Sequence, residues 1–147
     1  MRIGLPREVK DGEYRVALTP AGVSRLKHVV VEPGAGAEIG FTDEQYVQAG
    51  AALGDPWKCE LVVKVKELQA SEYAKPRRGH TIFGFQHFGP DPQLLDAALA
   101  SGATFIAPCR DAEGGRRAEG GARFMTHPRA EFHVSFMGHC SGWGWVG

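Results

Sequence analysis

Three basic side chains, Arg15, Lys66 and His87, have the chemistry and the positions to form a site for a small acid. An arginine guanidinium binds a carboxylate through two parallel hydrogen bonds. A lysine ammonium adds a point charge or polarises a carbonyl group, and a histidine, which titrates near neutral pH, can donate or accept a proton. Together these residue types describe a site for a small 2-oxo or 2-amino acid.

The elements around these residues indicate why they could meet. Strands that alternate with helices predict an α/β fold, a mostly parallel sheet with helices on both faces, and ligands bind such a sheet at the carboxyl ends of its strands. Arg15 follows the first predicted strand, and Lys66 and His87 each lie where a later one ends. The predicted strands cover residues 2–6, 28–33, 60–67, 80–86 and 103–108, and the predicted helices cover residues 19–27, 42–51 and 91–102.

The helix boundaries carry local signals. Thr19 is a predicted N-cap with Pro20 in the first helical position, and Thr42 is followed by acids in the first turn. The third helix has Pro92 near its start, and Gly102 is its predicted stop.

Each of the three basic residues also has a purely structural interpretation. Arg15 could be a solvated loop charge, and Lys66 could pair with Glu67, its neighbour in the chain. His87 could cap a helix or lie in the core. The sequence alone leaves both interpretations open.

Gly34, Gly36 and Gly40 follow the second predicted strand, as the glycines of a dinucleotide-binding turn would. That turn needs the spacing G-x-G-x-x-G directly before a helix. Here the last interval is one residue longer, and the next helix begins two residues later, at Thr42. We therefore interpret these glycines as a turn at the sheet edge, and we expect no cofactor to bind this chain alone.

The composition excludes several classes of function. The chain has 147 residues, and 17 lysines and arginines balance 17 acids, so no charge excess predicts nucleic acid or an anionic membrane as a partner. No apolar run approaches the roughly 20 residues of a membrane span, and no secretory signal is evident. Three widely spaced cysteines, Cys59, Cys109 and Cys140, favour reduced thiols and a cytoplasmic location.

Residues 110–147 differ in character from residues 1–109, which we assign to one domain. The later segment is rich in glycine, contains "AEGG" twice and lacks clear periodicity, so it predicts an irregular tail. Its possible metal ligands, His127, His133, His139 and Cys140, have no recognised ligand spacing, and no metal site is predicted. A tail that packs on the sheet or on a partner chain would use its aromatic residues, Phe132, Phe136, Trp143 and Trp145.

Four stretches resemble one family of enzymes. They read "MRIGLPREVKDGEYRVALTPAGVSRL", "VVVEPGAGAEIGFTDEQYVQAGA", "LVVKVKELQASEY" and "FGFQHFGPDPQLLDAALASGATFIA". They are similar to the N-terminal substrate domain of the family that contains alanine dehydrogenase, nicotinamide nucleotide transhydrogenase and saccharopine dehydrogenase. The resemblance covers roughly residues 1 to 108 and implies a flavodoxin-like parallel sheet.

The resemblance also implies roles for the basic residues. Arg15 and Lys66 would bind the carboxylate and the oxo or amino group of the substrate. His87, together with Lys66, would be catalytic, with His87 exchanging the proton when ketone and amine interconvert. The cofactor would be NAD or NADP, and the resemblance does not choose between them or among the 2-oxo and amino acids.

The nucleotide-binding domain that follows in the family has no counterpart in these 147 residues. Two hypotheses follow. The chain is the substrate half of an amino-acid dehydrogenase, inactive alone and completed by a nucleotide-binding partner chain. Alternatively, it is a non-catalytic remnant that keeps a small-acid-binding or oligomerisation role, as a homo-oligomer or otherwise.

Overall fold

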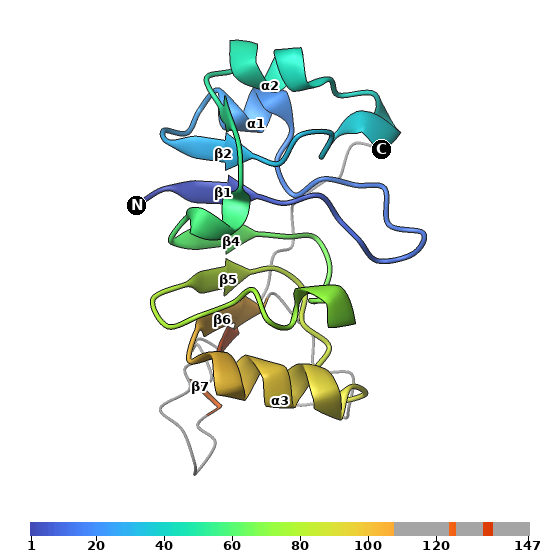
Figure 1. The fold of residues 1–147 in the computed structure, drawn as a ribbon, viewed down its shortest axis with the longest axis vertical. Coiled ribbons are helices and arrows are strands. Elements are labelled where there is room, and N and C mark those ends of the chain that lie inside the picture. Colours follow the sequence, from blue (N-terminus) through green and yellow to red (C-terminus); the bar gives the residue numbers. More distant parts are fainter. Residues whose placement is uncertain (108–123, 126–133, 137–147) are drawn as a thin grey trace, which may run out of the picture.

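The computed structural model describes residues 1–107, 124–125 and 134–136 (Figure 1). A single sheet organises them, with strands in the order β3-β2-β1-β4-β5-β6-β8-β7. All neighbouring strands are parallel except β7 and β8. The strands are β1 (Ile3–Leu5), β2 (Val29–Val31), β3 (Ala52–Leu53), β4 (Leu61–Val63), β5 (Thr81–Phe83), β6 (Thr104–Ala107), β7 (Phe124–Met125) and β8 (Val134–Phe136).

The sheet confirms the α/β prediction. All five predicted strands are present, as β1, β2, β4, β5 and β6. Numbered by their succession in the chain, these five lie in the order 2-1-3-4-5, which is the flavodoxin order. The sequence did not predict β3, a two-residue strand that pairs with β2. Two exposed residues show no periodicity that could reveal a strand.

Within residues 1–107, three α-helices connect the strands: α1 (Pro20–Val23), α2 (Asp43–Gln48) and α3 (Pro92–Ser101). Their boundary signals are confirmed, since Thr19 and Thr42 cap α1 and α2 with their side chains and Gly102 ends α3 in the left-handed conformation. The first helix is shorter than the predicted range 19–27. It ends at Val23 because the chain then turns toward β2, which it enters through His28 at a φ of 58°.

The part of the chain that the structure describes also contains three single-turn 3-10 helices that were not predicted. They are η1 (Ala37–Ile39), η2 (Pro56–Lys58) and η3 (Ala70–Glu72). Each has three residues, which is too short for the helical periodicity that sequence analysis detects.

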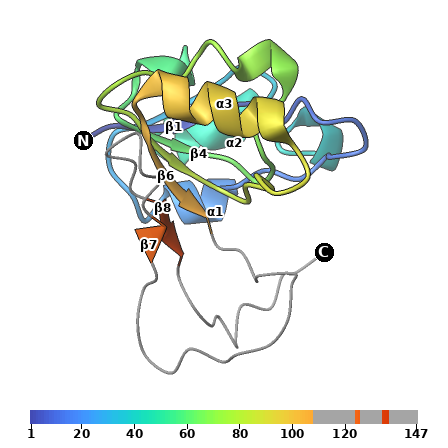
Figure 2. The same ribbon diagram turned by 90° about the horizontal axis from the view of Figure 1, so that it is seen from below.

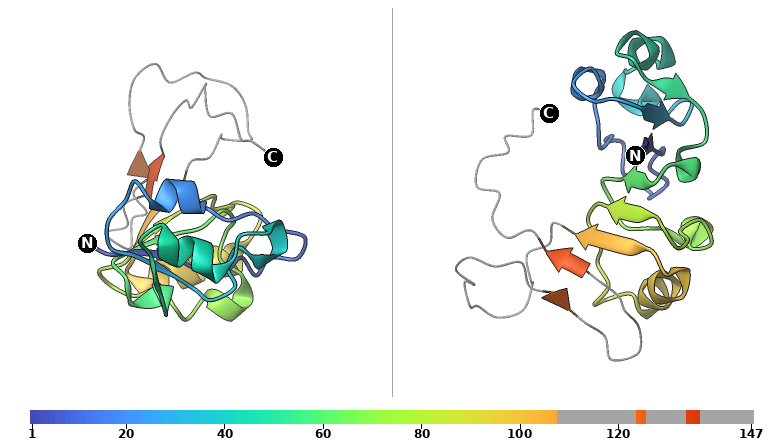
Figure 3. Two further views of the ribbon diagram at one scale, coloured as in Figure 1. Left: turned by 90° about the horizontal axis from the view of Figure 1, so that it is seen from above. Right: turned by 90° about the vertical axis from the view of Figure 1, so that its left-hand side faces the viewer.

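Apolar side chains form one core on each face of the sheet. Figure 2 shows α3 and α1 on opposite sides of the strands, and Figure 3 shows the same arrangement from the side. Burial on two faces explains why the strand sequences are almost continuously apolar. The α1 face buries Leu5, Val23, Val29, Val31 and Tyr46, and the α3 face buries Val62, Ile82, Leu94, Ala98 and Phe105.

The described part of residues 110–147 consists of β7 and β8, and β8 pairs in parallel with β6. These five residues differ from the irregular structure that the sequence predicts. The possible metal ligands His127, His133, His139 and Cys140 lie outside the described residues. Among the helices that the structure does describe, none has the length and apolar content to cross a bilayer.

Candidate functional site

The strand order places a topological switch point at the carboxyl ends of β1 and β4. The chain leaves β1 toward β2 and β3 and later returns to β4 on the other side of β1. The loops after β1 and β4 therefore diverge, and α/β proteins bind ligands at this switch point. Figure 1 shows the connections after β1, β4 and β5 leaving the sheet on the same side. Arg15, Lys66 and His87 lie in these three connections.

A close approach of the backbone brings the connection after β5 beside the end of β4. A Cβ atom on Gly84 would lie 2.5 Å from the carbonyl oxygen of Lys64. Only glycine at this position lets the two backbone segments run this close together. The backbone N–H of Phe85 then donates to the carbonyl of Val65. This pairing positions the segment that carries His87 next to the segment that carries Lys66.

His87 lies beside an acid that was not a predicted site residue. Its Nδ1 is 2.9 Å from Oε2 of Glu67, and the other carboxylate oxygen, Oε1, accepts a hydrogen bond from Nζ of Lys10. The Glu67 side chain is only 11% exposed, whereas His87 is 49% exposed. Burial opposes ionisation of Glu67, but the hydrogen bonds from Lys10 and His87 outweigh it and lower the pKa of Glu67 to about 2.

Arg15 lies in the connection after β1 and pairs with Glu13. Nε and one terminal nitrogen of Arg15 donate to the two oxygens of Glu13 over 2.8 and 2.6 Å. These hydrogen bonds lower the pKa of Glu13, and the nearby charge of Lys66 contributes in the same direction. Arg15 itself is 53% exposed, so the rest of its guanidinium faces solvent. It therefore keeps N–H groups for a second acceptor.

Lys66 is half-buried in the connection after β4. Its backbone N–H lies 3.4 Å from a carboxylate oxygen of Glu8, while the neighbouring Val65 N–H donates to the other oxygen over 2.6 Å. Within residues 1–107 its ammonium forms no hydrogen bond or ion pair. Lys66 is thus a positively charged group on a backbone that Glu8 anchors, and it is available to an anion.

A buried cluster supports this backbone. Nζ of Lys64 lies 2.8 Å from Glu72 and 3.4 Å from Glu8, and all three side chains are at most 3% exposed. Glu72 also accepts the backbone N–H of Gln69 at the start of η3. Burial raises the pKa of Glu8 despite the opposing charge of Lys64. The Lys64 cluster (Glu8, Lys64 and Glu72) joins the connections after β1 and β4 to η3.

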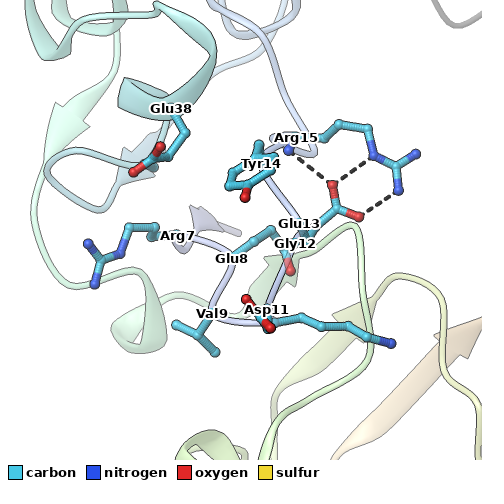
Figure 4. A pocket seen from close by; sticks show the side chains of 11 residues that line it. Arg7, Glu8, Val9, Asp11, Gly12, Glu13, Tyr14, Arg15 and Glu38 are labelled. Atoms are coloured by element: carbon cyan, nitrogen blue, oxygen red, sulfur yellow. Dashed lines mark hydrogen bonds and ion pairs between the residues drawn. The ribbon is translucent and has the colours of Figure 1, made fainter.

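A cavity of about 320 Å³ opens along the connection after β1 (Figure 4). Arg15 and Glu13 line one side of it, and Tyr14, Arg7 and Glu38 line others. Lys66 and His87 do not line this cavity. The three predicted residues therefore share one edge of the sheet but not one enclosed pocket.

The structure decides between several interpretations that the sequence left open. Glu67 pairs with His87 and Lys10, so the alternative that Lys66 pairs with Glu67 is wrong. His87 neither caps α3, whose N-cap is Asp91, nor lies in the core. The sequence analysis did not predict the acids Glu8, Glu13 and Glu67 as site residues. Of the three, only Glu67 had a signal in the sequence, since it directly follows Lys66 at a predicted strand end.

The glycine turn does not fit a dinucleotide. A Cβ atom on Gly36 would lie 2.7 Å from Cβ of Phe41 and 2.9 Å from the ring of Tyr46, so protein side chains fill the space beside it. The N-terminus of α2 is closed by a capping box between Thr42 and Gln45. Gly36 is therefore packed within this turn, whereas a Cβ atom on Gly34 or Gly40 would meet nothing within 4 Å. In the described part of the chain, no group of three or more potential ligands could hold a metal ion.

Comparisons with known proteins give the family. Residues 4–108 match the family described as "Alanine dehydrogenase/PNT, N-terminal domain". Among solved structures, an L-alanine dehydrogenase is 38% identical with a TM-score of 0.70, over 73% of this chain and 32% of that one. A transhydrogenase from Sinorhizobium meliloti is 27% identical with a TM-score of 0.67, over 73% of this chain and 34% of that one.

Curated relatives agree. An alanine dehydrogenase of Bacillus subtilis is 39% identical over 88% of this chain and 40% of its own length. One from Bilophila wadsworthia is 43% identical, and one from Mycobacterium tuberculosis is 41% identical, each over 73% of this chain. The chain spans 30 to 40% of the length of these relatives.

The alignment with the Bacillus subtilis protein covers 88% of this chain, which is a larger share than residues 4–108 make up. The similarity therefore continues past residue 108, where the sequence analysis expected it to end. The family match, the identities near 40% and the matching fold agree with one another. The chain belongs to the alanine dehydrogenase/PNT N-terminal domain family.

Proposed function

We propose that the chain is the substrate-binding part of an NAD(P)-dependent amino-acid dehydrogenase that interconverts a 2-oxo acid and an amino acid. One observation carries the proposal. Arg15, Lys66 and the paired His87 lie in the three connections that leave the carboxyl ends of β1, β4 and β5. Binding and proton transfer would then occur at one edge of one sheet.

Arg15 and Lys66 would bind the anionic end of the substrate. Arg15 keeps three of its five N–H groups after pairing with Glu13, because that pairing uses one on Nε and one on a terminal nitrogen. The Lys66 ammonium has no hydrogen-bond or ion-pair partner among residues 1–107, so it would attract the carboxylate or polarise the oxo group.

His87 would exchange a proton with the oxo or amino group. Its ring is half-exposed, and the Glu67 contact engages one ring nitrogen and leaves the other for the substrate. The nicotinamide cofactor would supply the hydride. The glycine turn after β2 does not fit it, so we place its site outside residues 1–107. A cytoplasmic location and a nucleotide-binding partner chain are predictions from the sequence and form part of this proposal.

Calorimetric titration of the purified chain with pyruvate, glyoxylate and 2-oxoglutarate tests the proposal. We expect saturable binding of at least one acid. Lys66→Ala and Arg15→Ala should each weaken it by about 1.5–3 kcal/mol, or about 10- to 150-fold, which is the loss of one charge-assisted hydrogen bond. His87→Ala should leave the affinity nearly unchanged, because the imidazole does not hold the carboxylate.

Lys27→Ala and Arg25→Ala are the matched controls. Both side chains are exposed and precede β2, at the opposite ends of the strands, so neither variant should change the affinity. A folded wild-type chain that binds none of the acids would contradict the proposal. An equal loss in all three site variants would indicate misfolding and would also count against it.

A further inference from the structure

The Glu67 carboxylate is held at both of its oxygens. Oε2 faces Nδ1 of His87 at 2.9 Å, and Oε1 is bonded to Nζ of Lys10. The two partners come from different connections, since Lys10 follows β1 and His87 follows β5. A carboxylate bound on both sides cannot rotate freely, so the direction of its contact with the imidazole is defined.

The charge on Glu67 decides which way the hydrogen bond to His87 runs. With a pKa of about 2, the carboxyl group is ionised at neutral pH. An ionised carboxylate only accepts hydrogen bonds. Nδ1 of His87 must therefore carry the proton, and a neutral ring then has its lone pair on Nε2.

We propose that Glu67 is a positioning residue that fixes His87 in the Nδ1–H tautomer, with Lys10 holding the carboxylate in place. This inference rests on the proposed function, in which His87 exchanges a proton with the substrate. The fixed tautomer gives Nε2 one role: it accepts a proton when the ring is neutral and returns it when the ring is charged. An imidazole that is free in water prefers the opposite tautomer, so the carboxylate has a measurable effect.

Two-bond hydrogen–nitrogen NMR spectra of the ¹⁵N-histidine-labelled full chain test the inference without substrate. The His87 signals are assigned by their loss in His87→Gln, and the ratio of tautomers is read at a pH high enough for the ring to be neutral. We expect the wild-type chain to show mainly Nδ1–H. Glu67→Ala should reverse the ratio to mainly Nε2–H, and Glu44→Ala, which removes an exposed acid on α2, should leave it unchanged.

Mainly Nε2–H in the wild-type chain, or an unchanged ratio in Glu67→Ala, would overturn the inference. If Glu67→Ala does not fold, Glu67→Gln replaces it, because the amide has the same size and can donate as well as accept. The fraction of Nδ1–H should then fall, and an undiminished fraction would overturn the inference. Failure of the proposed function would appear separately, as a folded wild-type chain that binds no 2-oxo acid.

Discussion

At the scale of the residue, the buried Lys64 cluster shows how charged groups can form the scaffold of a site. Lys64 is 0% exposed and lies between the carboxylates of Glu8 and Glu72. Both acids also accept backbone N–H groups, from Val65 and Gln69 respectively. The cluster is satisfied only while all its members are present, because a buried charge without its partner is costly.

Lys64→Ala should therefore lower the free energy of unfolding by about 3–5 kcal/mol, the cost of breaking a buried pair by removing one partner. Urea denaturation followed by far-UV circular dichroism measures it. Lys27→Ala is the control, and as an exposed substitution it should stay within about 0.5 kcal/mol of the wild type. A loss in Lys64→Ala no larger than that of the control would show that the cluster does not stabilise the fold.

Glu67 makes a separate prediction about pH. Its pKa falls from the ordinary value of 4.5 to about 2 on folding, so its contribution to stability is present above about 4.5 and is lost as the pH falls toward 2. Glu8, whose pKa burial raises, acts in the opposite direction. We therefore compare the wild type with Glu67→Gln, in which Glu8 is unchanged.

The difference in unfolding free energy between these two proteins should be largest near pH 6 and should shrink as the pH falls from about 4.5 toward 2. Urea denaturation at a series of pH values measures it. Asp96→Asn, which removes an exposed acid on α3, is the control for the general effect of removing an acid. A difference that grows on acidification would contradict the assigned direction of the Glu67 shift.

The basic residues of the site could be predicted, whereas their acidic partners could not. Arg15, Lys66 and His87 stand out because each follows a recognisable strand and has distinctive chemistry. Their acidic partners depend on tertiary contacts, since Glu67 lies 20 residues from His87 and 57 residues from Lys10. No local pattern specifies such pairs.

At the scale of the element, helix starts were predictable and strand ends were not. Caps such as Thr42 act within one turn, so a short sequence contains the whole signal. The apolar runs 60–67 and 80–86 predict longer strands than β4 and β5, which end at Val63 and Phe83. Lys66 and His87 consequently lie in loops beyond the strands. The Val65 N–H in the first of these loops donates to the carboxylate of Glu8, which no pattern along the chain could indicate.

Gly84→Ala tests the close approach between β4 and the chain after β5. The added Cβ would meet the carbonyl oxygen of Lys64 at 2.5 Å, and a backbone atom cannot move aside as a flexible side chain can. We expect the free energy of unfolding to fall by about 1–3 kcal/mol, as for other overpacked positions. Thermal and urea denaturation measure it.

Gly89→Ala is the matched control, since it lies in the same connection and an added Cβ there would meet nothing within 4 Å. It should leave stability nearly unchanged. If both variants unfold at the same denaturant concentration, the contact at Gly84 does not constrain the connection that carries His87.

At the scale of the whole molecule, the order of the strands explains why residues far apart in the sequence share one edge. The alternation of strands and helices predicted a parallel sheet, and that was sufficient to place three loops at one end of it. The alternation does not specify the order itself, with β1 between β2 and β4; that order agrees with the flavodoxin-like sheet that the family resemblance implies. The chain spans 30 to 40% of the length of its curated relatives, so what it does without the rest of such a protein can be tested directly.

We predict that the 147-residue polypeptide alone binds a 2-oxo acid without oxidising NADH. The turn at Gly36 is packed by Phe41 and Tyr46, so this turn offers no cradle for the pyrophosphate of a dinucleotide. Hydride transfer requires the nicotinamide and the substrate to be held in contact.

Calorimetry with NADH should therefore show no saturable binding. The absorbance of NADH should stay constant when the polypeptide is mixed with pyruvate and ammonium. A full-length alanine dehydrogenase is the positive control. NADH consumption by the polypeptide that His87→Ala abolishes would place a cofactor site within these 147 residues and would overturn this prediction.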